Sequence, residues 1–283
     1  MRDLHRCRSA LSLNTATLGH RRPVEDVVDL CAARGFGAIA PWRRDLETCR
    51  PADLAARVRD RGLTVSGLCR STYLTGATAA DRRAAIDDNA RALDLAAALG
   101  AACYVLVVGG LPPGERDLEE ARRQVCDGVA ALLDRARDVG VPLALEPLHP
   151  MTAAERSCLN TLAQALDWCD ALDPDRRGGL GVIVDAYHVW WDPDLAAGIA
   201  RACRDRRVLG FHVSDWLRDT RDLVTDRGMM GDGVIDLRRL RALLEDGGYA
   251  GPVEVEIFSS ANWWTRPEAQ VLDVCIERLL TVC

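Results

Sequence analysis

Four short segments of the chain each place an acidic or imidazole side chain at the end of what the pattern predicts to be a buried strand. The segments are PLALEPL with Glu146, GVIVDAYH with Asp185 and His188, LGFHVSD with His212, and VEVEIF with Glu256. An unpaired carboxylate in an apolar strand costs several kcal/mol unless a partner compensates its charge. Because the four positions are equivalent, one divalent cation is the simplest common partner.

The alternation of side chains along these strands separates two faces. One set is purely apolar and is expected to face surrounding helices: Leu143, Leu145, Val182, Val184, Phe211, Val213, Val255 and Ile257. The opposite set carries Glu146, Asp185, His212 and Glu256, so these four side chains are expected to point inward together. Glu254 shares their parity one layer deeper, and it would replace Glu256 as a ligand if the register were shifted by two residues.

Two glutamates, one aspartate and one histidine form a hard, oxygen-rich donor set, which favours Mn²⁺, with Mg²⁺, Co²⁺ or Zn²⁺ as alternatives. Such a site leaves room for two adjacent substrate oxygens, as in a hydroxy-ketone sugar. The metal would polarise the carbonyl, and Glu146 and Glu256, on opposite walls, would act as bases on either face of the neighbouring carbon. A buried network of ion pairs with arginines is the alternative, but it does not predict the shared position at the strand ends.

Strand-length apolar runs alternate with amphipathic segments along the whole chain, which predicts an α/β fold with a single (β/α)8 TIM barrel over residues 1–283. The expected strands are 11–17, 37–42, 63–69, 103–109, 142–148, 180–187, 208–214 and 253–258. The expected helices lie near 23–34, 51–61, 79–99, 117–139, 160–172, 193–204, 236–246 and 267–281. The long connections 149–159 and 215–235 are candidate covers of the site, which would lie at the C-terminal ends of the strands.

Composition excludes several other kinds of chemistry. The chain has 283 residues and no lysine, so its 36 basic residues are all arginine. Schiff-base catalysis by a lysine and phosphate binding by a P-loop lysine are therefore excluded. The net charge of -6 argues against a nucleic-acid partner, and no apolar run reaches the roughly 20 residues that span a bilayer. Eleven scattered cysteines without a CxxC pair indicate a reduced, cytoplasmic protein.

Five segments carry further motifs: LALEPLHP, VDAYHVWWDP, FHVSDWLRD, GMMGDGVID and GPVEVEIF. They resemble the xylose-isomerase-like TIM-barrel superfamily, the sugar phosphate isomerase/epimerase family. The resemblance to its ketose 3-epimerase branch implies that the four strand-end residues hold the metal and that the two glutamates are the acid–base pair. It also implies that His188 and Arg218 bind substrate, since they follow the metal aspartate by three residues and the metal histidine by six.

The chain departs from that branch in one connection. The resemblance implies a further substrate-binding glutamate six residues after the first ligand, where this chain has Thr152. Glu155 or His149 could take its place, so the substrate is not identified as a free ketohexose. Endonuclease IV belongs to the same superfamily, but its three-zinc site needs more histidines at strand ends than the five in this chain provide.

Three more side chains near the expected mouth are candidates for binding substrate. His149 follows Glu146 by three residues, Asn14 points inward on the first strand, and Trp216 is one of six tryptophans that follow or close strands. Indoles at such positions can stack on the apolar face of a sugar, or they can simply fill the rim of the barrel.

These observations predict a metal-dependent isomerase or epimerase of a sugar, or of a sugar-like keto or hydroxy compound, that abstracts a proton next to a metal-bound carbonyl. Two alternatives stay open. One is a lyase or dehydratase that acts on a keto-cyclitol or keto-sugar at the same metal site, and the other is an accessory barrel subunit that binds a sugar. The expected partner is a small-molecule substrate, without nucleic acid or membrane, and a homo-oligomer is one alternative for the assembly.

Overall fold

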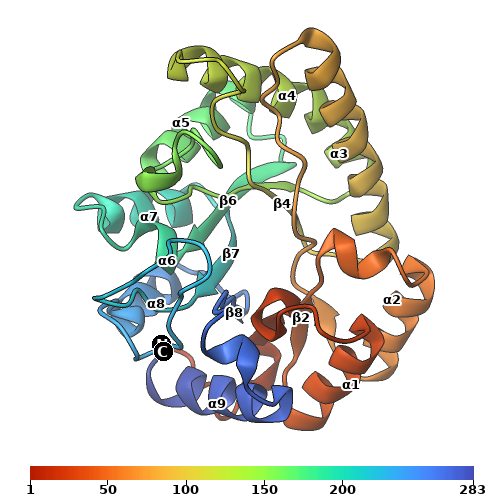
Figure 1. The fold of residues 1–283 in the computed structure, drawn as a ribbon, viewed down its shortest axis with the longest axis vertical. Helices are drawn as coiled ribbons and strands as arrows, with labels where there is room; N and C mark the ends of the chain where they lie inside the picture. The colour runs from red at the N-terminus through yellow and green to blue at the C-terminus, as the bar shows by residue number, and fades with distance from the viewer.

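Eight parallel strands form the inner layer of the computed structural model, which describes residues 1–283, and helices surround them (Figure 1). Their hydrogen-bonded order is β3-β2-β1-β8-β7-β6-β5-β4. The strands are β1 (Leu11–Asn14), β2 (Ala38–Ala40), β3 (Thr64–Val65), β4 (Tyr104–Leu106), β5 (Leu143–Leu145), β6 (Leu180–Asp185), β7 (Val208–Val213) and β8 (Val253–Val255). Parallel bridges from Val65 to Ala101 and from Leu68 to Tyr104 join the β3 side to the β4 side, so the sheet curls into a barrel. The predicted (β/α)8 architecture is confirmed.

Nine α-helices follow or connect these strands. They are α1 (Val24–Arg34), α2 (Pro51–Asp60), α3 (Ala79–Leu99), α4 (Leu118–Val139), α5 (Leu162–Leu172), α6 (Ala186–Val189), α7 (Leu195–Arg204), α8 (Leu237–Asp246) and α9 (Glu268–Thr281). Short 3-10 helices complete the chain: η1 (Arg8–Ala10), η2 (Thr15–Leu18), η3 (Arg43–Leu46), η4 (Pro150–Thr152) and η5 (Trp263–Thr265). None of the helices combines the length and the apolar character needed to cross a bilayer.

Helix α3 illustrates how local sequence sets the limits of these elements. Thr78 and Asp81 form a capping box, in which each side chain accepts a hydrogen bond from the backbone N–H of the other residue. The helix ends at Gly100, whose φ of 70° is a left-handed conformation that glycine adopts without steric cost.

The two faces predicted from the alternation of side chains are confirmed. The apolar set of β5 to β8 belongs to a cluster of 67 buried residues that joins the strands to the helices. A separate cluster of only five residues fills the inside of the barrel: Cys69, Cys103, Val105, Ala144 and Ile183. The interior is therefore only partly apolar, and the space towards the C-terminal ends of the strands is left to polar groups.

One difference from the predicted elements follows β6. The sequence predicts a strand over 180–187, but the strand ends at Asp185 and a single helical turn, α6, begins at once. The reason is local, because the carboxylate of Asp185 accepts the backbone N–H of Tyr187 at 2.8 Å and so turns the chain.

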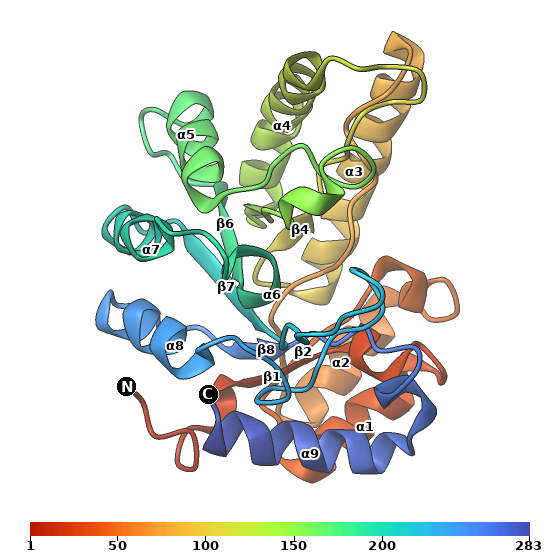
Figure 2. The ribbon, with the colours of Figure 1, turned by 60° about the vertical axis from the view of Figure 1, so that its left-hand side comes forward.

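The two ends of the chain lie near α8 and α9 (Figure 2). Arg241 of α8 holds them there, since its guanidinium donates hydrogen bonds to the carbonyl oxygens of both Arg2 and Cys283. The seam of the barrel itself is closed by the parallel pairing of β1 with β8.

Candidate active site

Side chains from four neighbouring strands meet at one end of the barrel. Glu146 directly follows β5, Asp185 ends β6, His212 lies near the end of β7, and Glu256 directly follows β8. Each offers one ligand atom, and these four atoms all lie within 4.8 Å of one another. All four residues are buried. The structure therefore brings together the four residues that the sequence analysis selected as a metal-binding set.

The arrangement of these atoms suits a shared cation better than it suits hydrogen bonds between the side chains. Oε1 of Glu146 lies at ion-pair distance from Nδ1 of His212, 3.0 Å, but the two buried atoms are not oriented for a hydrogen bond and neither has another hydrogen-bond partner. A buried polar atom without a partner is costly, and an ion that both atoms could bind would remove that cost. Three carboxylates and one imidazole suit a divalent ion that prefers oxygen, and they also suit Zn²⁺.

Crowding and burial change the acid–base properties of the cluster. Burial, followed by the charge of Glu146, raises the pKa of Glu256 to about 8. Burial also raises the pKa of Asp185 to about 6. Burial disfavours the protonated form of His212, but the charges of Glu254 and Glu146 outweigh this effect and raise the pKa of His212 well above its usual range. The cluster therefore lacks positive charge, which is the condition that a bound divalent ion relieves.

Arg227, which lies in the connection 215–235, supplies part of that positive charge. Its Nη1 lies 3.2 Å from Oε2 of Glu256 and 3.5 Å from Oδ2 of Asp185. Its guanidinium lies between the rings of Tyr187 and Phe258, with Cζ 4.4 Å and 4.5 Å from their centroids. The ion-pair network considered as an alternative is thus present on one side of the cluster, whereas the buried atoms of Glu146 and His212 stay without a partner.

His188 lies on α6 between this arginine and the connection after β5. Its Nδ1 accepts the backbone N–H of His149 at 3.1 Å, and its Nε2 lies 3.1 Å from Nη2 of Arg227 and 3.7 Å from Oδ2 of Asp185. Burial, and then the charge of Arg227, lowers the pKa of His188 well below its usual range. The ring is therefore neutral and has one acceptor nitrogen, so it can accept from either the His149 N–H or the Arg227 guanidinium but not from both.

A polar layer lies directly beneath the cluster. Nδ2 of Asn14 donates to Oε1 of Glu254 and to Oε1 of Glu256, each at 3.0 Å. Glu254 also accepts a hydrogen bond from Ser66 at 2.6 Å, and its Oε1 lies 3.5 Å from Nε2 of His212. Glu254 is therefore placed to orient the His212 ring from below, whereas the carboxylate of Glu256 lies in the cluster itself.

A cavity of about 20 Å³ lies over the cluster. Of the five residues predicted to contact substrate, His188 lines this cavity. His149 and Trp216 stack on each other with ring centroids 4.6 Å apart, and Arg218 is exposed in the connection after β7. The substrate-binding roles of His188, Arg218, His149, Trp216 and Asn14 stay predictions.

Three arginines that the sequence analysis did not assign to the site also line this cavity. They are Arg70, Arg156 and Arg227. Arg156 and Arg227 belong to the two long connections that were predicted as covers, and Arg70 follows the bridge between Cys69 and Trp42. Side-chain alternation carries no signal in such connections, and only their unusual length pointed to them.

The sequence of residues 28–275 matches the model of a protein family, the xylose isomerase-like TIM barrel. The chain belongs to this family. Protein SMc04130 from Sinorhizobium meliloti 1021 is 51% identical, with a TM-score of 0.94 over 98% of this chain and 99% of that chain. The ketose 3-epimerase of Arthrobacter globiformis is 27% identical over 236 residues, which are 80% of this chain and 73% of that protein. The IOLI protein with a binding zinc atom shares the fold at 20% identity and a TM-score of 0.81, over 96% of this chain and 97% of that chain.

Proposed function

We propose that this member of the xylose isomerase-like TIM-barrel family is a metal-dependent isomerase or epimerase of a keto-sugar. The observation that carries the proposal is the buried set of ligand atoms within 4.8 Å, from Glu146, Asp185, His212 and Glu256. The similarity to a ketose 3-epimerase supports a sugar substrate, and the zinc of the IOLI protein supports a divalent ion. Mn²⁺ is the ion that we expect, because three of the four donors are carboxylates.

The four cluster residues would hold the ion. The ion would act as a Lewis acid that polarises the substrate carbonyl and makes the neighbouring C–H more acidic. Glu256 is the group that takes the proton from that carbon, because burial makes its carboxylate a stronger base than an exposed glutamate. Glu146, from the opposite wall, returns a proton to the other face and so inverts the carbon. His188, which lines the cavity, contacts a substrate oxygen, and Phe258 and Leu148 keep water from the reacting atoms.

The reaction class can be read by NMR in deuterated buffer with a panel of keto-sugars and keto-cyclitols. Exchange of the hydrogen next to the carbonyl, with formation of an isomeric sugar, supports the proposal. Loss of water from the substrate assigns the chain to the lyase alternative. Binding without exchange assigns it to the accessory alternative.

The ligand assignment has a separate test in the variant Glu256→Gln. The proposal expects this variant to lose both activity and bound metal, because the amide is a poorer ligand and cannot act as a base. Glu277→Gln is the matched control, since Glu277 is an exposed glutamate of α9. Full metal content together with full activity in Glu256→Gln would refute the assignment.

A further inference from the structure

Two arginines at the edge of the cavity form no ion pair with a carboxylate of the protein. Arg70 and Arg156 both line the cavity that contains Glu146 and Glu256. Neither has a carboxylate oxygen within 4.0 Å, and Nη1 of Arg156 is buried without a hydrogen-bond partner. Arg70 contacts only an aromatic ring, with its Cζ 4.8 Å from the centroid of Tyr73.

The fully buried arginines of the chain behave differently. Arg207, Arg227 and Arg241 each form an ion pair with a carboxylate, at 2.7, 3.2 and 2.8 Å. A buried guanidinium normally needs such a partner, because the loss of hydration is costly. Arg70 and Arg156 are half-buried, but Nη1 of Arg156 is buried without a partner, and this atom indicates a group that comes from outside the chain.

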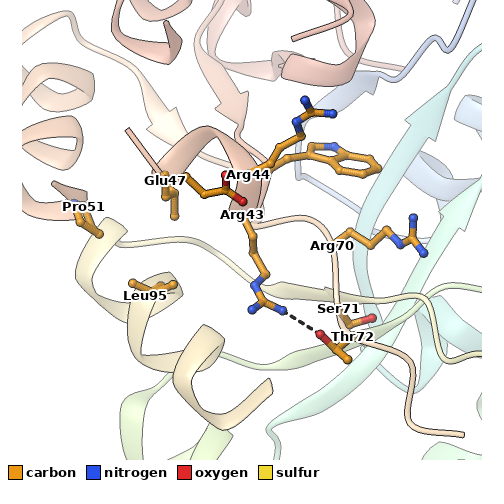
Figure 3. Close-up of a pocket in the computed structure, with 10 residues that line it drawn as sticks. Arg43, Arg44, Glu47, Pro51, Arg70, Ser71, Thr72 and Leu95 are labelled. Atoms are coloured by element: carbon orange, nitrogen blue, oxygen red, sulfur yellow. Dashed lines mark hydrogen bonds between the residues drawn. The ribbon is translucent and has the colours of Figure 1, made fainter. Parts of the chain in front are cut away.

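A larger pocket of about 510 Å³ adjoins the cavity and shares Trp42 and Arg70 with it. Figure 3 shows that the Arg70 side chain extends away from Arg43, whose guanidinium points to Thr72. Arg43 is already neutralised, because Asp88 lies 2.8 Å from its Nη2. Arg70 is therefore the uncommitted cation that lies between the two spaces.

The balance of charges around the cavity also favours an anionic group from outside the chain. The three carboxylates of the cluster and the Glu254 carboxylate beneath them exceed a divalent ion by two negative charges, and Arg227 balances one of these through its contacts with Asp185 and Glu256. Arg70 and Arg156 then add two positive charges above the site, which leaves an excess of one positive charge. A concave site with excess positive charge attracts anionic ligands and binds them more strongly than neutral ones.

We propose that Arg70 and Arg156 form a subsite for an acidic group of the substrate, a phosphate or a carboxylate. This inference rests on the proposed function and narrows its substrate from keto-sugars in general to acidic keto-sugars. Guanidinium N–H groups match the oxygens of both acids in pairs. The carbonyl end of the substrate reaches the cluster, and the acidic end lies between Arg70 and Arg156, next to the larger pocket.

The test compares a 2-ketopentose, its 5-phosphate and a keto-sugar acid of the same chain length as substrates of the Mn²⁺-loaded protein. We expect kcat/KM of the wild-type protein to be at least about 10-fold higher for one of the acidic compounds, and the preferred compound distinguishes phosphate from carboxylate. Arg70→Gln and Arg156→Gln should lower that value by about 10- to 100-fold, mainly through KM. The same variants should change kcat/KM for the neutral ketopentose by no more than about twofold, because a lost charge contact affects only the acidic compounds.

Two controls separate binding from folding. Arg83→Gln removes an exposed arginine of α3 and should change none of the values. Arg70→Lys and Arg156→Lys keep the charge, and they should recover part of the preference even if the glutamine variants fold poorly. A wild-type preference for the neutral sugar, or an equal loss for neutral and acidic sugars in the variants, would overturn the subsite.

Calorimetric titration of the same acidic compounds into the protein makes the two proposals separable. If no sugar is converted but the acid still binds, and binding weakens in Arg70→Gln and Arg156→Gln, the proposed function fails and the subsite holds. If the neutral sugar is epimerised and the acidic group adds nothing to binding, the function holds and the subsite fails.

Discussion

Nη1 of Arg227 lies 3.2 Å from Oε2 of Glu256, so a protein cation touches one of the carboxylates that would bind the metal. The same nitrogen lies 3.5 Å from Oδ2 of Asp185. Arg227 therefore stabilises two of the crowded carboxylates in the metal-free protein. Once a divalent ion binds, the guanidinium and the ion repel each other across the same carboxylates.

Replacement of Arg227 by glutamine should therefore affect the metal-free and the metal-loaded protein differently. We expect the free energy of unfolding of the metal-free variant to fall by about 3–5 kcal/mol, because two buried carboxylates lose their partner. Addition of Mn²⁺ should raise Tm more in Arg227→Gln than in the wild-type protein. Thermal unfolding with and without the ion measures both effects, and an equal rise in the two proteins would contradict the repulsion.

Metal removal has an expected outcome of its own. Chelation should abolish sugar conversion and lower Tm, since the repulsion among Glu146, Asp185 and Glu256 is then left to Arg227 and His212. Mn²⁺ at about 100 times its dissociation constant should restore about 2.7 kcal/mol of stability. Activity and Tm that are unchanged after exhaustive dialysis against a chelator would exclude a metal role for the cluster.

Glu254 should act on the metal through His212 without binding it. Replacement by glutamine removes the negative charge beside Nε2 of His212 but can still accept a hydrogen bond from Ser66. We expect Mn²⁺ affinity to fall by about 10- to 100-fold in Glu254→Gln, as for other groups that orient a metal-binding histidine. Titration calorimetry measures the loss, with Glu277→Gln as the control, and an unchanged affinity would show that Glu254 has no such role.

Stability away from the site should depend on Asp173 and on pH. Asp173 is buried between Arg207 and Arg137, whose nitrogens lie 2.7 Å and 2.8 Å from its carboxylate. Burial opposes ionisation of this carboxyl, but the hydrogen bond from Arg207 and the other contacts outweigh burial and lower the pKa of Asp173. A lowered pKa stabilises the fold above the ordinary aspartate pKa of about 3.9, and this stabilisation is lost as the pH falls through the lower value.

The variant Asp173→Ala should accordingly lose about 3–5 kcal/mol of unfolding free energy at pH 7, because Arg207 is left buried without its partner. The difference from the wild-type protein should shrink below about pH 4 as Asp173 itself becomes protonated. Urea denaturation at several pH values measures this trend. Asp175→Ala, at an exposed neighbouring position, is the control, and a loss that is the same at pH 3 and pH 7 would be the contrary result.

The four residues of the cluster could be predicted because their signal is local. A strand alternates its side chains with a period of two, so one polar residue in an apolar strand is assigned to a face by its immediate neighbours. Arg227 could not be assigned in this way. Its position depends on a backbone hydrogen bond to Phe258 and on the bridge between Asp215 and Gly228, contacts that no periodic pattern encodes.

The same limit applies to Arg70 and Arg156, which reach the cavity from connections on different sides of the barrel. The end of β6 shows a smaller failure of the same kind. The apolar run up to Tyr187 predicts a longer strand, and the side chain of Asp185 stops it by binding the Tyr187 N–H. Hydrogen bonds between a side chain and its own backbone compete with the strand pattern, and apolar periodicity does not record them.

The cavity over the cluster, at about 20 Å³, holds roughly one water molecule, whereas a keto-sugar is several times larger. Binding therefore requires movement of the groups that line the cavity, among them Arg156 and Arg227 of the two long connections. Turnover then includes a gating motion, and thickening the solvent with sucrose or glycerol should slow it in proportion to viscosity whenever that motion, rather than proton transfer, limits the rate.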